Sequence, residues 1–509
     1  MTTFTDLSLR NGRTFTQPTG LFINNEFVAG QGQPIESYDP YTGKQIATVH
    51  AASPEDVEKA VAAAEKAFDS WKHESSASRA RLLHKLADLM ERDLENLAAI
   101  EAMDSGKAYK IAQAVDIKGA IDTIRYFAGW TDKSFGQTID TGPSSLNYTR
   151  HEPIGVVGQI VPWNFPLLIW AWKIAPAIAC GNVCIIKSAE QTPLSALCAA
   201  ALIKEAGFPP GVINVITGVG NVTGAAMASH PRIRKIAFTG STPVGRSILK
   251  AAADSNLKRV TLELGGKSPN IVCEDADFEK AVESVTMGIF FNHGQNCCAG
   301  SRAYIHDGIF DRFVAAIKIR VSSLAIGDPF DEATFQGPQV SKLQFDRIMD
   351  LVEKGKAHGA EAIIGGNRHN AGDLFIEPTI FTKISQDSPL RGEIFGPVLC
   401  LERFTDLKDV VRKANDTEFG LAAGVHTKNI DKAIRLANEI ESGIVWVNTY
   451  GSLPPQMPMG KSSSPAERKV ADRISILGGF KQSGIGRDLG AQAMSEYSQI
   501  KAVQIALAG

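Results

Sequence analysis

Two stretches of the chain carry side chains suited to covalent catalysis. Cys297 lies in residues 294–302 (GQNCCAGSR), where small residues follow an apolar helical run and leave its thiol accessible. Glu263 lies in residues 262–269 (LELGGKSP), 34 positions earlier (297 − 263). A cysteine attacks as the thiolate, and a carboxylate can accept a proton as a general base. The sequence therefore offers a nucleophile and a base, while the neighbouring Cys298 must point elsewhere and is expected to be an inert buried thiol.

An alternation of short β-prone runs and helices provides the framework for these groups. Strands are predicted at 156–161, 183–187, 212–217 and 235–239, and a helix at 192–206. Such alternation is typical of a parallel, Rossmann-like sheet that binds ligands at the carboxyl ends of its strands. The last strand runs into a turn between Gly240 and Gly245 that should open a helix near Pro243. Its backbone N–H groups could receive a phosphate, although a plain turn explains the pattern about as well.

Other elements are predicted from local patterns. Residues 21–28 indicate a hairpin, and Ser53 and Asp56 indicate a capping box with Pro54 in the first helical turn. One long helix with a broad apolar face is predicted at 79–104, and a polar β-prone excursion at 131–150. A second α/β unit should begin after Lys267, with helices at 277–292, 308–324, 341–358, 407–414 and 431–440, and residues 501–507 should form an edge strand.

Residues 262–269 and 294–302 together resemble the two signature motifs of the aldehyde dehydrogenase superfamily, and the resemblance extends from about Gly20 to the C-terminus. It implies an α/β fold with a Rossmann-like NAD-binding domain, an α/β catalytic domain and a small β oligomerisation element. The implied boundaries are 15–130 with 154–262, then 263–486 including an insertion at 461–478, and finally 131–153 with 487–509. The last strand would pair with the 131–153 excursion in a homo-oligomer, by analogy a tetramer.

The resemblance also implies a reaction. Cys297 would attack an aldehyde, and the amide of Asn164 with the backbone N–H of Cys297 would hold the oxyanion. Oxidation by NAD would turn the thiohemiacetal into a thioester, and Glu263 would activate the water that hydrolyses it. Members that pass the acyl group to coenzyme A tend to lack this carboxylate, so Glu263 favours release of the free acid. The chain is therefore expected to be an NAD-dependent aldehyde dehydrogenase.

The resemblance assigns the cofactor and substrate contacts to particular residues. Lys187 and Glu190 would hold the adenosine ribose, where a carboxylate would repel a 2′-phosphate and favour NAD over NADP. The complete cofactor set is Ile160, Trp163, Lys187, Glu190, Gly240, Ser241, Gly245, Glu393 and Phe395. The walls of the aldehyde tunnel would be Phe165, Trp172, Phe291, Leu453 and Met459, which favours an aliphatic or aromatic aldehyde.

Composition excludes several other classes of function. With 44% hydrophobic residues, 21% charged residues and a net charge of −2, nothing in the chain favours nucleic acid or an anionic membrane. Seven cysteines, an odd number, favour a reducing compartment, and we expect the cytoplasm, with the mitochondrial matrix as the alternative. Cys180 and Cys184 lack a matching pair at zinc spacing, so no metal site is expected.

One departure from the family pattern affects the expected activity. The family runs P-x-G-G-[FY]-K without a break, whereas here 18 residues (478 − 461 + 1) separate Gly460 from Gly479. A tolerated surface loop is one hypothesis. A translated intron is the one we favour, because Gly460-Lys461-Ser462 can be encoded by GGTAAGT and removal of the segment keeps the frame and restores the motif.

Two readings compete with an active aldehyde dehydrogenase. The first is a catalytically impaired or structural member of the family, whose site is disturbed by the 461–478 insertion. The second is a thiol acyltransferase or hydrolase, in which His293 would assist Cys297 without a dinucleotide. The turn between Gly240 and Gly245 argues against the second reading.

Overall fold

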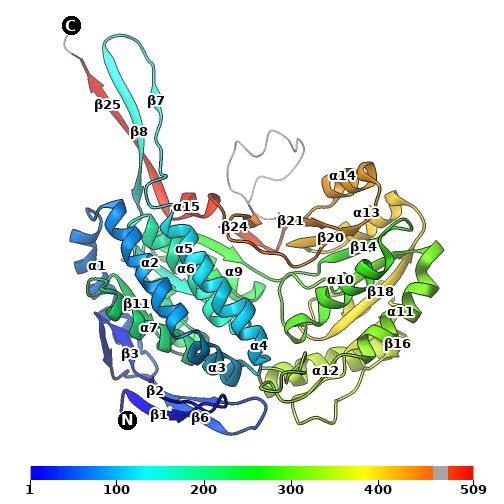
Figure 1. Ribbon diagram of the computed structural model, residues 1–509. Helices are drawn as coiled ribbons and strands as arrows, with labels where there is room; N and C mark the ends of the chain where they lie inside the picture. Colours follow the sequence, from blue (N-terminus) through cyan, green and yellow to red (C-terminus); the bar gives the residue numbers. More distant parts are fainter. Residues whose placement is uncertain (1, 462–479, 508–509) are drawn as a thin grey trace.

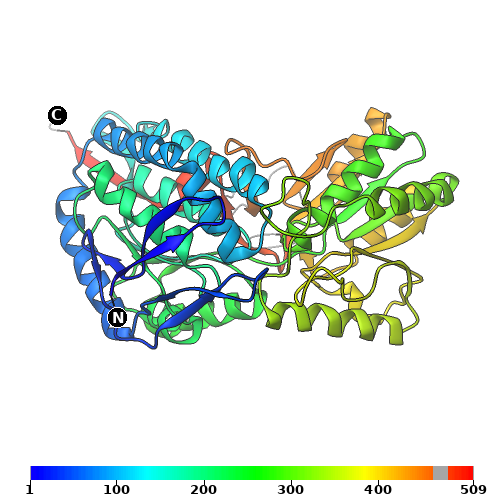
Figure 2. The ribbon, with the colours of Figure 1, turned by 60° about the horizontal axis from the view of Figure 1, so that its bottom comes forward.

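Two large sheets, each flanked by helices, form the two halves of the molecule (Figure 1). The structure is a computed structural model and describes residues 2–461 and 480–507. The blue-to-green part of the chain builds most of one half and the green-to-orange part builds the other, and a turned view shows them side by side (Figure 2). The α/β fold class predicted from the sequence is therefore confirmed.

The first sheet is parallel at its centre and antiparallel at both margins. Its strands, from one edge to the other, are β22 (Met459–Lys461), β24 (Gly484–Asp488), β13 (Arg259–Glu263), β12 (Lys235–Thr239), β9 (Val156–Ile160), β10 (Val183–Lys187), β11 (Ile213–Ile216), β3 (Leu21–Ile23) and β4 (Glu26–Val28). The five from β13 to β11 run parallel, whereas β24 and β3 join their neighbours antiparallel. The four predicted central strands are confirmed within two residues at each end.

Helices pack against this sheet and against one another. They are α1 (Pro54–Trp71), α2 (Ser76–Arg92), α3 (Leu94–Ser105), α4 (Tyr109–Ile111), α5 (Lys118–Ala128), α6 (Pro166–Ala179), α7 (Leu194–Ala206), α8 (Ala225–Ser229) and α9 (Thr242–Ser255), with a π-helical turn at Ala112–Ile117. The predicted capping box at Ser53 is confirmed, since Ser53 and Asp56 exchange side-chain to backbone contacts. The predicted 192–206 helix is α7, which ends before Gly207 at φ 91°.

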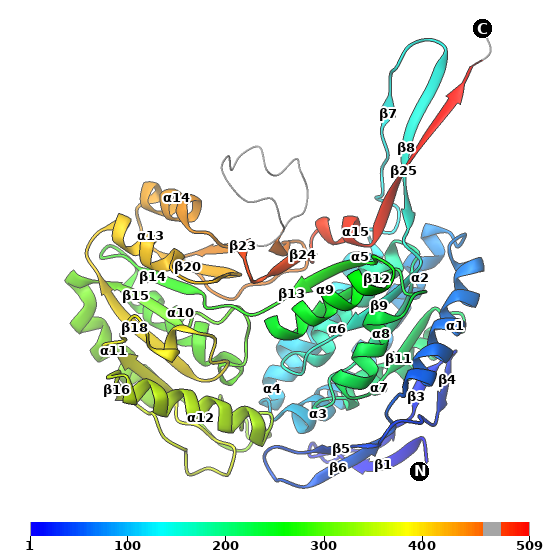
Figure 3. The same cartoon turned by 180° about the vertical axis from the view of Figure 1, so that it is seen from behind.

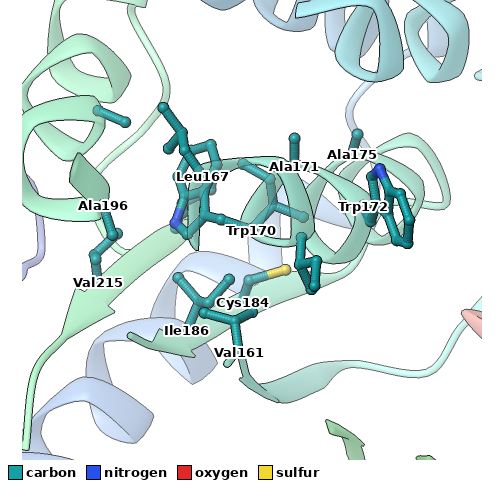
Figure 4. Close-up of a cluster of buried hydrophobic side chains, with 14 of the residues drawn as sticks. Val161, Leu167, Trp170, Ala171, Trp172, Ala175, Cys184, Ile186, Ala196 and Val215 are labelled. Atoms are coloured by element: carbon teal, nitrogen blue, oxygen red, sulfur yellow. The ribbon is translucent and has the colours of Figure 1, made fainter. Parts of the chain in front are cut away.

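The helix α6 is apolar on almost every side because it is enclosed by the sheet and by α2, α5 and α7. Trp170 is fully buried in the main core, near Cys184 and Ile186 of β10. Trp172, two residues on, points in another direction (Figure 4). Lys173 is the one charged residue of this helix, and it too is buried. The sequence of α6 thus combines a core-filling face with side chains that reach toward the functional site.

One predicted helix is two helices in the structure. The expected helix at 79–104 is divided at Asp93, whose φ of −99° and ψ of 14° interrupt the helical path between α2 and α3. Aspartate is a poor residue for a helix interior, and the Asp93 carboxylate pairs with Arg92 at 2.7 Å. The apolar pattern runs across the break, which is why periodicity alone predicted one element.

The second sheet has seven strands. In spatial order they are β16 (Glu361–Ile364), β17 (Thr379–Thr382), β18 (Val398–Phe404), β15 (Arg302–His306), β14 (Pro269–Val272), β20 (Ala422–His426) and β21 (Ile444–Val447), with only β16 antiparallel to its neighbour. Its helices are α10 (Phe278–Phe290), α11 (Phe310–Ser322), α12 (Lys342–Ala357), α13 (Leu407–Asn415) and α14 (Ile430–Glu439). The five helices predicted after Lys267 are confirmed, and no end is shifted by more than two residues.

A three-stranded arm projects from the first half of the molecule and carries the C-terminus (Figure 3). It consists of β7 (Thr138–Ile139), β8 (Ser145–Pro153) and β25 (Ser498–Ala506), and the short helix α15 (Gln492–Glu496) leads into β25. Nine residue pairs from Ser498↔Pro153 to Ala506↔Ser145 join β25 to β8. The predicted pairing of the C-terminal strand with the 131–153 excursion is therefore confirmed.

The remaining strands form small hairpins and one distant pair. They are β1 (Phe4–Ser8) with β2 (Thr14–Pro18), β5 (Ile35–Tyr38) with β6 (Gln45–Val49), and β19 (Phe419–Gly420) with β23 (Phe480–Lys481). The predicted 21–28 hairpin is β3–β4, and both turn residues, Asn24 and Asn25, have positive φ as a type I′ turn requires.

The domain boundaries stay a prediction, although β22 and β24, assigned from the sequence to the catalytic domain, lie in the nine-stranded sheet. The insertion predicted at 461–478 lies, beyond Lys461, outside the described residues. Among the described residues, no helix combines the length and apolarity needed to cross a membrane.

Candidate active site

The carboxyl ends of four neighbouring parallel strands bring the predicted site residues to one edge of the first sheet. Ile160, Lys187 and Thr239 end β9, β10 and β12, and Glu263 ends β13. The register pairs Lys187 with Ile160 and Thr239 with Glu263, so these residues form a row. Ligands bind at the carboxyl ends of the strands in such sheets. This row is therefore expected to form part of a binding site.

The turn before Cys297 is held in an uncommon backbone conformation. Asn292, His293 and Gly294 have φ values of 51°, 60° and 69° in succession, just after α10. A Cβ at Gly294 would collide with the Gly396 carbonyl, so the close approach requires glycine. His293 Nε2 accepts the Gly337 N–H at 3.0 Å, and Gln295 Oε1 accepts the Val340 N–H at 3.1 Å. These contacts fix the turn that presents Cys297.

Cys297 and Glu263 line one large cavity. The cavity has a volume of about 890 Å³. All five predicted tunnel residues, Phe165, Trp172, Phe291, Leu453 and Met459, line it as well. Phe165 and Phe291 stack with ring centroids 6.2 Å apart. The cavity therefore joins the thiol and the carboxylate to a mainly apolar wall, and Cys298, Tyr450 and Asp488 also contribute to it.

The surroundings of Cys297 favour its neutral thiol. A hydrogen bond with Cys298, burial, and the charges of Glu263 and Glu393 all raise the pKa of the Cys297 thiol. The Cys298 thiol, itself buried as predicted, donates to Asn296 Oδ1 at 3.2 Å. A positive charge brought close to Cys297 would act in the opposite direction and increase the fraction of thiolate.

Glu263 is buried beside the cavity with one carboxylate oxygen, Oε2, that has no hydrogen-bond partner among the described residues. Burial and the neighbouring Asp488 carboxylate raise the pKa of Glu263 well above its usual range. Gly460, at φ 91°, faces the other oxygen, and a Cβ there would collide with it. A carboxyl group in this setting is suited to general base catalysis.

Asn164 holds a different position from the other predicted catalytic residues. Its side-chain N–H donates to the Gln295 carbonyl at 3.1 Å, and it is not among the residues that line the cavity. Its own carbonyl accepts from Lys107 Nζ and from Asn292 Nδ2, each at 3.0 Å. Asn164 is thus packed against the turn two residues before Cys297, with a second amide hydrogen left for another acceptor.

The predicted cofactor residues fall at the same sheet edge and across from it. Lys187 Nζ lies 3.4 Å from Glu190 Oε2. Ser241 is the N-cap of α9 and makes no side-chain cap bond, which leaves that helix end suited to an anion. Gly245 packs α9 against β13, because a Cβ there would lie 2.8 Å from Leu264 Cδ2.

Glu393 and Phe395 come from the second half of the molecule. Glu393 accepts the Gly266 N–H at 3.0 Å, and burial raises its pKa. The Phe395 ring meets the Trp163 ring edge to face, with centroids 5.3 Å apart. The two halves therefore meet at residues predicted to hold the nicotinamide end of the cofactor.

His293 cannot serve Cys297 as a base. It is buried, its Nε2 already accepts a backbone N–H, and burial lowers its pKa to about 3. It does not line the cavity with Cys297. The structure therefore does not support a thiol hydrolase with His293 as base, because the ring is buried, bonded to the Gly337 N–H and absent from the cavity lining.

Sequence reasoning missed several residues that support the site. Lys173 Nζ pairs with Asp488 at 2.6 Å next to Glu263, and Tyr450 donates its hydroxyl to the Cys298 carbonyl at 2.8 Å. A signal for Lys173 was present, since it is the one charge in an apolar helix. No local signal pointed to Lys107, because its contacts with Asn164 join segments 57 residues apart.

The amino-acid sequence matches a family model and several known proteins over nearly its whole length. Residues 27–503 match the model of the aldehyde dehydrogenase family. An aldehyde dehydrogenase of Aspergillus niger is 54% identical over 99% of this chain and 98% of its own, and one of Emericella nidulans is 54% identical over 97% and 96%.

Solved structures agree with the relatives. The NAD⁺ complex of an aldehyde dehydrogenase from Bacillus cereus superposes with a TM-score of 0.91 at 44% identity, covering 96% of this chain and 97% of that one. The resemblance inferred from residues 262–269 and 294–302 is thereby confirmed, and the chain belongs to the aldehyde dehydrogenase family.

Proposed function

We propose that the chain oxidises an uncharged aldehyde to the carboxylic acid with NAD, through a thioester on Cys297 that Glu263-activated water hydrolyses. The observation that carries this proposal is that Cys297 and Glu263 line one mainly apolar cavity. The cavity lies at the carboxyl edge of a parallel sheet, where a dinucleotide can bind. We do not favour an impaired or structural protein, because both reacting groups face this cavity.

The residues at the sheet edge fit NAD. The uncapped start of α9 at Ser241 suits the pyrophosphate, and the Lys187–Glu190 pair suits the hydroxyls of the adenosine ribose. Three exposed apolar side chains nearby, Val219, Val222 and Val244, offer a surface for the adenine ring. When bound, NAD supplies the hydride acceptor, and its nicotinamide ring brings a positive charge. A relative whose structure contains NAD⁺ supports the same assignment.

The first half of the reaction belongs to Cys297. Its thiolate sulfur forms a bond to the aldehyde carbon, and the carbonyl oxygen takes the electron pair as an oxyanion. The free amide hydrogen of Asn164 and the backbone N–H of Cys297 are the donors that we assign to that oxyanion. Loss of hydride from the same carbon leaves a thioester.

The second half belongs to Glu263. Its ionised carboxylate takes a proton from water as the water oxygen attacks the thioester carbon. The sulfur then leaves with the electron pair, which regenerates the Cys297 thiolate and releases the acid. The raised pKa of Glu263 makes this group a stronger base than an ordinary carboxylate.

The cavity wall indicates the class of aldehyde. Phe165, Trp172, Phe291, Leu453 and Met459 supply apolar surface, and no lysine of the described residues lines the cavity. Arg125, which also lines the cavity, is paired with Asp88 and Glu91. A carboxylate-bearing aldehyde would therefore lose its hydration without gaining an unpaired cation, so aliphatic and aromatic aldehydes are favoured.

The arm formed by β7, β8 and β25 supports assembly of the chain. In the described chain β25 is an edge strand with exposed apolar side chains, Ile500 and Ile505 among them. Long apolar edges of this kind are covered in stable proteins. We assign the cover to other copies of this chain, in a homotetramer.

Turnover by purified protein tests the proposed function. NADH formation is expected with hexanal and benzaldehyde and much less with glyoxylate, which is charged. Cys297→Ala should abolish it, because this change removes the thiol to which the attack on the aldehyde is assigned. The matched control is Cys198→Ala, which removes a buried cysteine of α7 outside the cavity and should retain activity. Equal rates in the two variants would refute the nucleophile assignment.

A further inference from the structure

A buried group of three charged side chains lies behind Asn164. Lys107 and Asp116 form an ion pair, and Glu101 Oε1 lies 4.0 Å from Lys107 Nζ. All three side chains are at most 1% exposed. Glu101 belongs to α3, Lys107 follows that helix, and Asp116 lies in the π-helical turn at Ala112–Ile117. None of these residues lines the cavity, so the cluster acts on the site only through what it contacts.

The contacts of this cluster converge on the strand-to-helix turn that carries Asn164. Lys107 Nζ donates to the Asn164 carbonyl at 3.0 Å and lies 4.3 Å from the centroid of the Phe165 ring. Glu101 Oε2 accepts the Leu167 N–H at 3.2 Å, in the first turn of α6. The turn is therefore held at three successive points, by a hydrogen bond, a cation–π contact and a helix-end hydrogen bond.

The charge state of the cluster suits a fixed ammonium group. Burial and the Asp116 carboxylate raise the pKa of Glu101 well above its usual range, which favours the neutral form of this carboxyl group. Lys107 and Asp116 form the ion pair of the cluster. Separating the two members of a buried ion pair leaves each without a counter-charge, which is strongly unfavourable. Asp116 therefore holds Lys107 Nζ in place.

The Asn164 carbonyl has a second donor from the Cys297 side. Asn292 Nδ2 donates to it at 3.0 Å and to the Gln295 carbonyl at 3.1 Å. The Asn164 amide donates to that same Gln295 carbonyl. Asn164 is thus joined to the nucleophile turn by two amides and to the charged cluster by Lys107, so its position relative to Cys297 depends on both sides.

We propose that Lys107, anchored by Asp116, is a positioning residue that holds the Asn164 main chain so that the Asn164 amide can reach the oxyanion formed at Cys297. The inference rests on the proposed function, since it assigns Lys107 a role only through Asn164. It adds a buried ion pair, remote from the substrate, to the groups on which the rate of the first step depends. An arrangement that is held in place in advance costs no reorganisation when charge develops.

A double-mutant cycle tests this coupling. Lys107→Met combined with Asp116→Asn removes the pair without stranding a charge, and kcat for hexanal oxidation is measured with and without Asn164→Ala. We expect Asn164→Ala alone to lower kcat by about 10²-fold or more, as for other oxyanion donors. The paired change should lower kcat by about tenfold in the native background and by less than about twofold in the Asn164→Ala background.

Asn292→Gly supplies an independent variant that strands no charge. Glycine accepts the φ of 51° at this position, and the change removes the other donor to the Asn164 carbonyl. Asn292→Gly should lower kcat by about tenfold in the native background. In the Asn164→Ala background it should lower kcat by less than about twofold. The matched control is Lys258→Met, which removes a buried lysine that donates to the Ala228 carbonyl before β13, at the far end of the strand from Glu263.

The possible outcomes separate the two claims. Equal losses in both backgrounds, for the paired change and for Asn292→Gly, would show that these residues only stabilise the fold and would overturn the proposal. Full activity of Asn164→Ala would overturn both the proposal and the oxyanion assignment. A loss in Asn164→Ala without coupling to Lys107 would leave the proposed function intact and refute the positioning role alone.

Discussion

At the scale of single residues, the site combines two groups whose surroundings disfavour their charged forms. The pKa of Cys297 is raised by its hydrogen bond to Cys298, by burial and by nearby carboxylates, and the pKa of Glu263 is raised by burial and by Asp488. The surroundings shift both the proposed nucleophile and the proposed base toward their neutral forms. They also make the rate of the reaction sensitive to pH and to the charge of a bound cofactor.

The pH dependence of kcat follows from Glu263. The base works only when ionised, so kcat should fall as the pH decreases through its raised pKa. Asp488→Asn removes a carboxylate that raises this pKa and leaves the cationic Lys173 beside Glu263. The acid limb of a kcat profile should therefore move to lower pH in that variant. A limb that stays in place, or moves to higher pH, would contradict the assignment of the base. His293 cannot produce the limb, because its pKa is about 3.

At the scale of elements, strand ends and one turn position the site. The ends of β9, β10 and β12 follow from the alternating pattern of the sequence, whereas β13, which ends at Glu263, was not predicted as a strand. The cofactor roles of Ile160, Lys187, Gly240 and Ser241 were implied by the resemblance to the family. The placement of Cys297 depends on three left-handed residues and on hydrogen bonds to residues 337–340. Local patterns do not encode such contacts, so the role of His293 was open until the turn was seen.

The same contrast applies to the helices. Apolar periodicity predicted α7 and the helices after Lys267 well, because each apolar pattern corresponds to one uninterrupted helix. It failed at Asp93, where the pattern continues across a break in the chain. It was also silent on Lys107 and Asn292, whose significance comes from partners distant in sequence. The role of a buried charged residue can be assigned only when the group that it contacts is known.

The exposed edge strand β25 predicts assembly through the arm. Ile500→Lys with Ile505→Lys places two charges on this strand at side chains that are 67% and 42% exposed, so folding of one chain should be preserved. The mass measured by light scattering should drop from that of the proposed tetramer to that of a smaller assembly, because buried unpaired charges disfavour the interface. Ile319→Lys, at a 75% exposed position on α11, is the control and should leave the assembly unchanged. Unchanged mass in the double variant would exclude the arm as an interface.

At the scale of the whole molecule, the two halves supply different parts of one site. The first sheet contributes Glu263 and the edge at which we propose that the cofactor binds, while the second half contributes Cys297, Glu393 and Phe395. Contacts such as Glu393 with Gly266 and Phe395 with Trp163 join the halves at the site itself. A site between two sheet-centred units can bring the proposed nucleophile, base and dinucleotide together.

The measurement that tests the central claim most directly is the intact mass of Glu263→Gln protein mixed with NAD and excess hexanal. Without the base, the thioester should accumulate, and the protein should gain the mass of the aldehyde less two hydrogens, with the modified peptide containing Cys297. That mass distinguishes an oxidised thioester from a simple thiohemiacetal, which would keep both hydrogens. Unmodified protein that still forms NADH at every turnover, or an adduct carried by Cys298, would contradict the account.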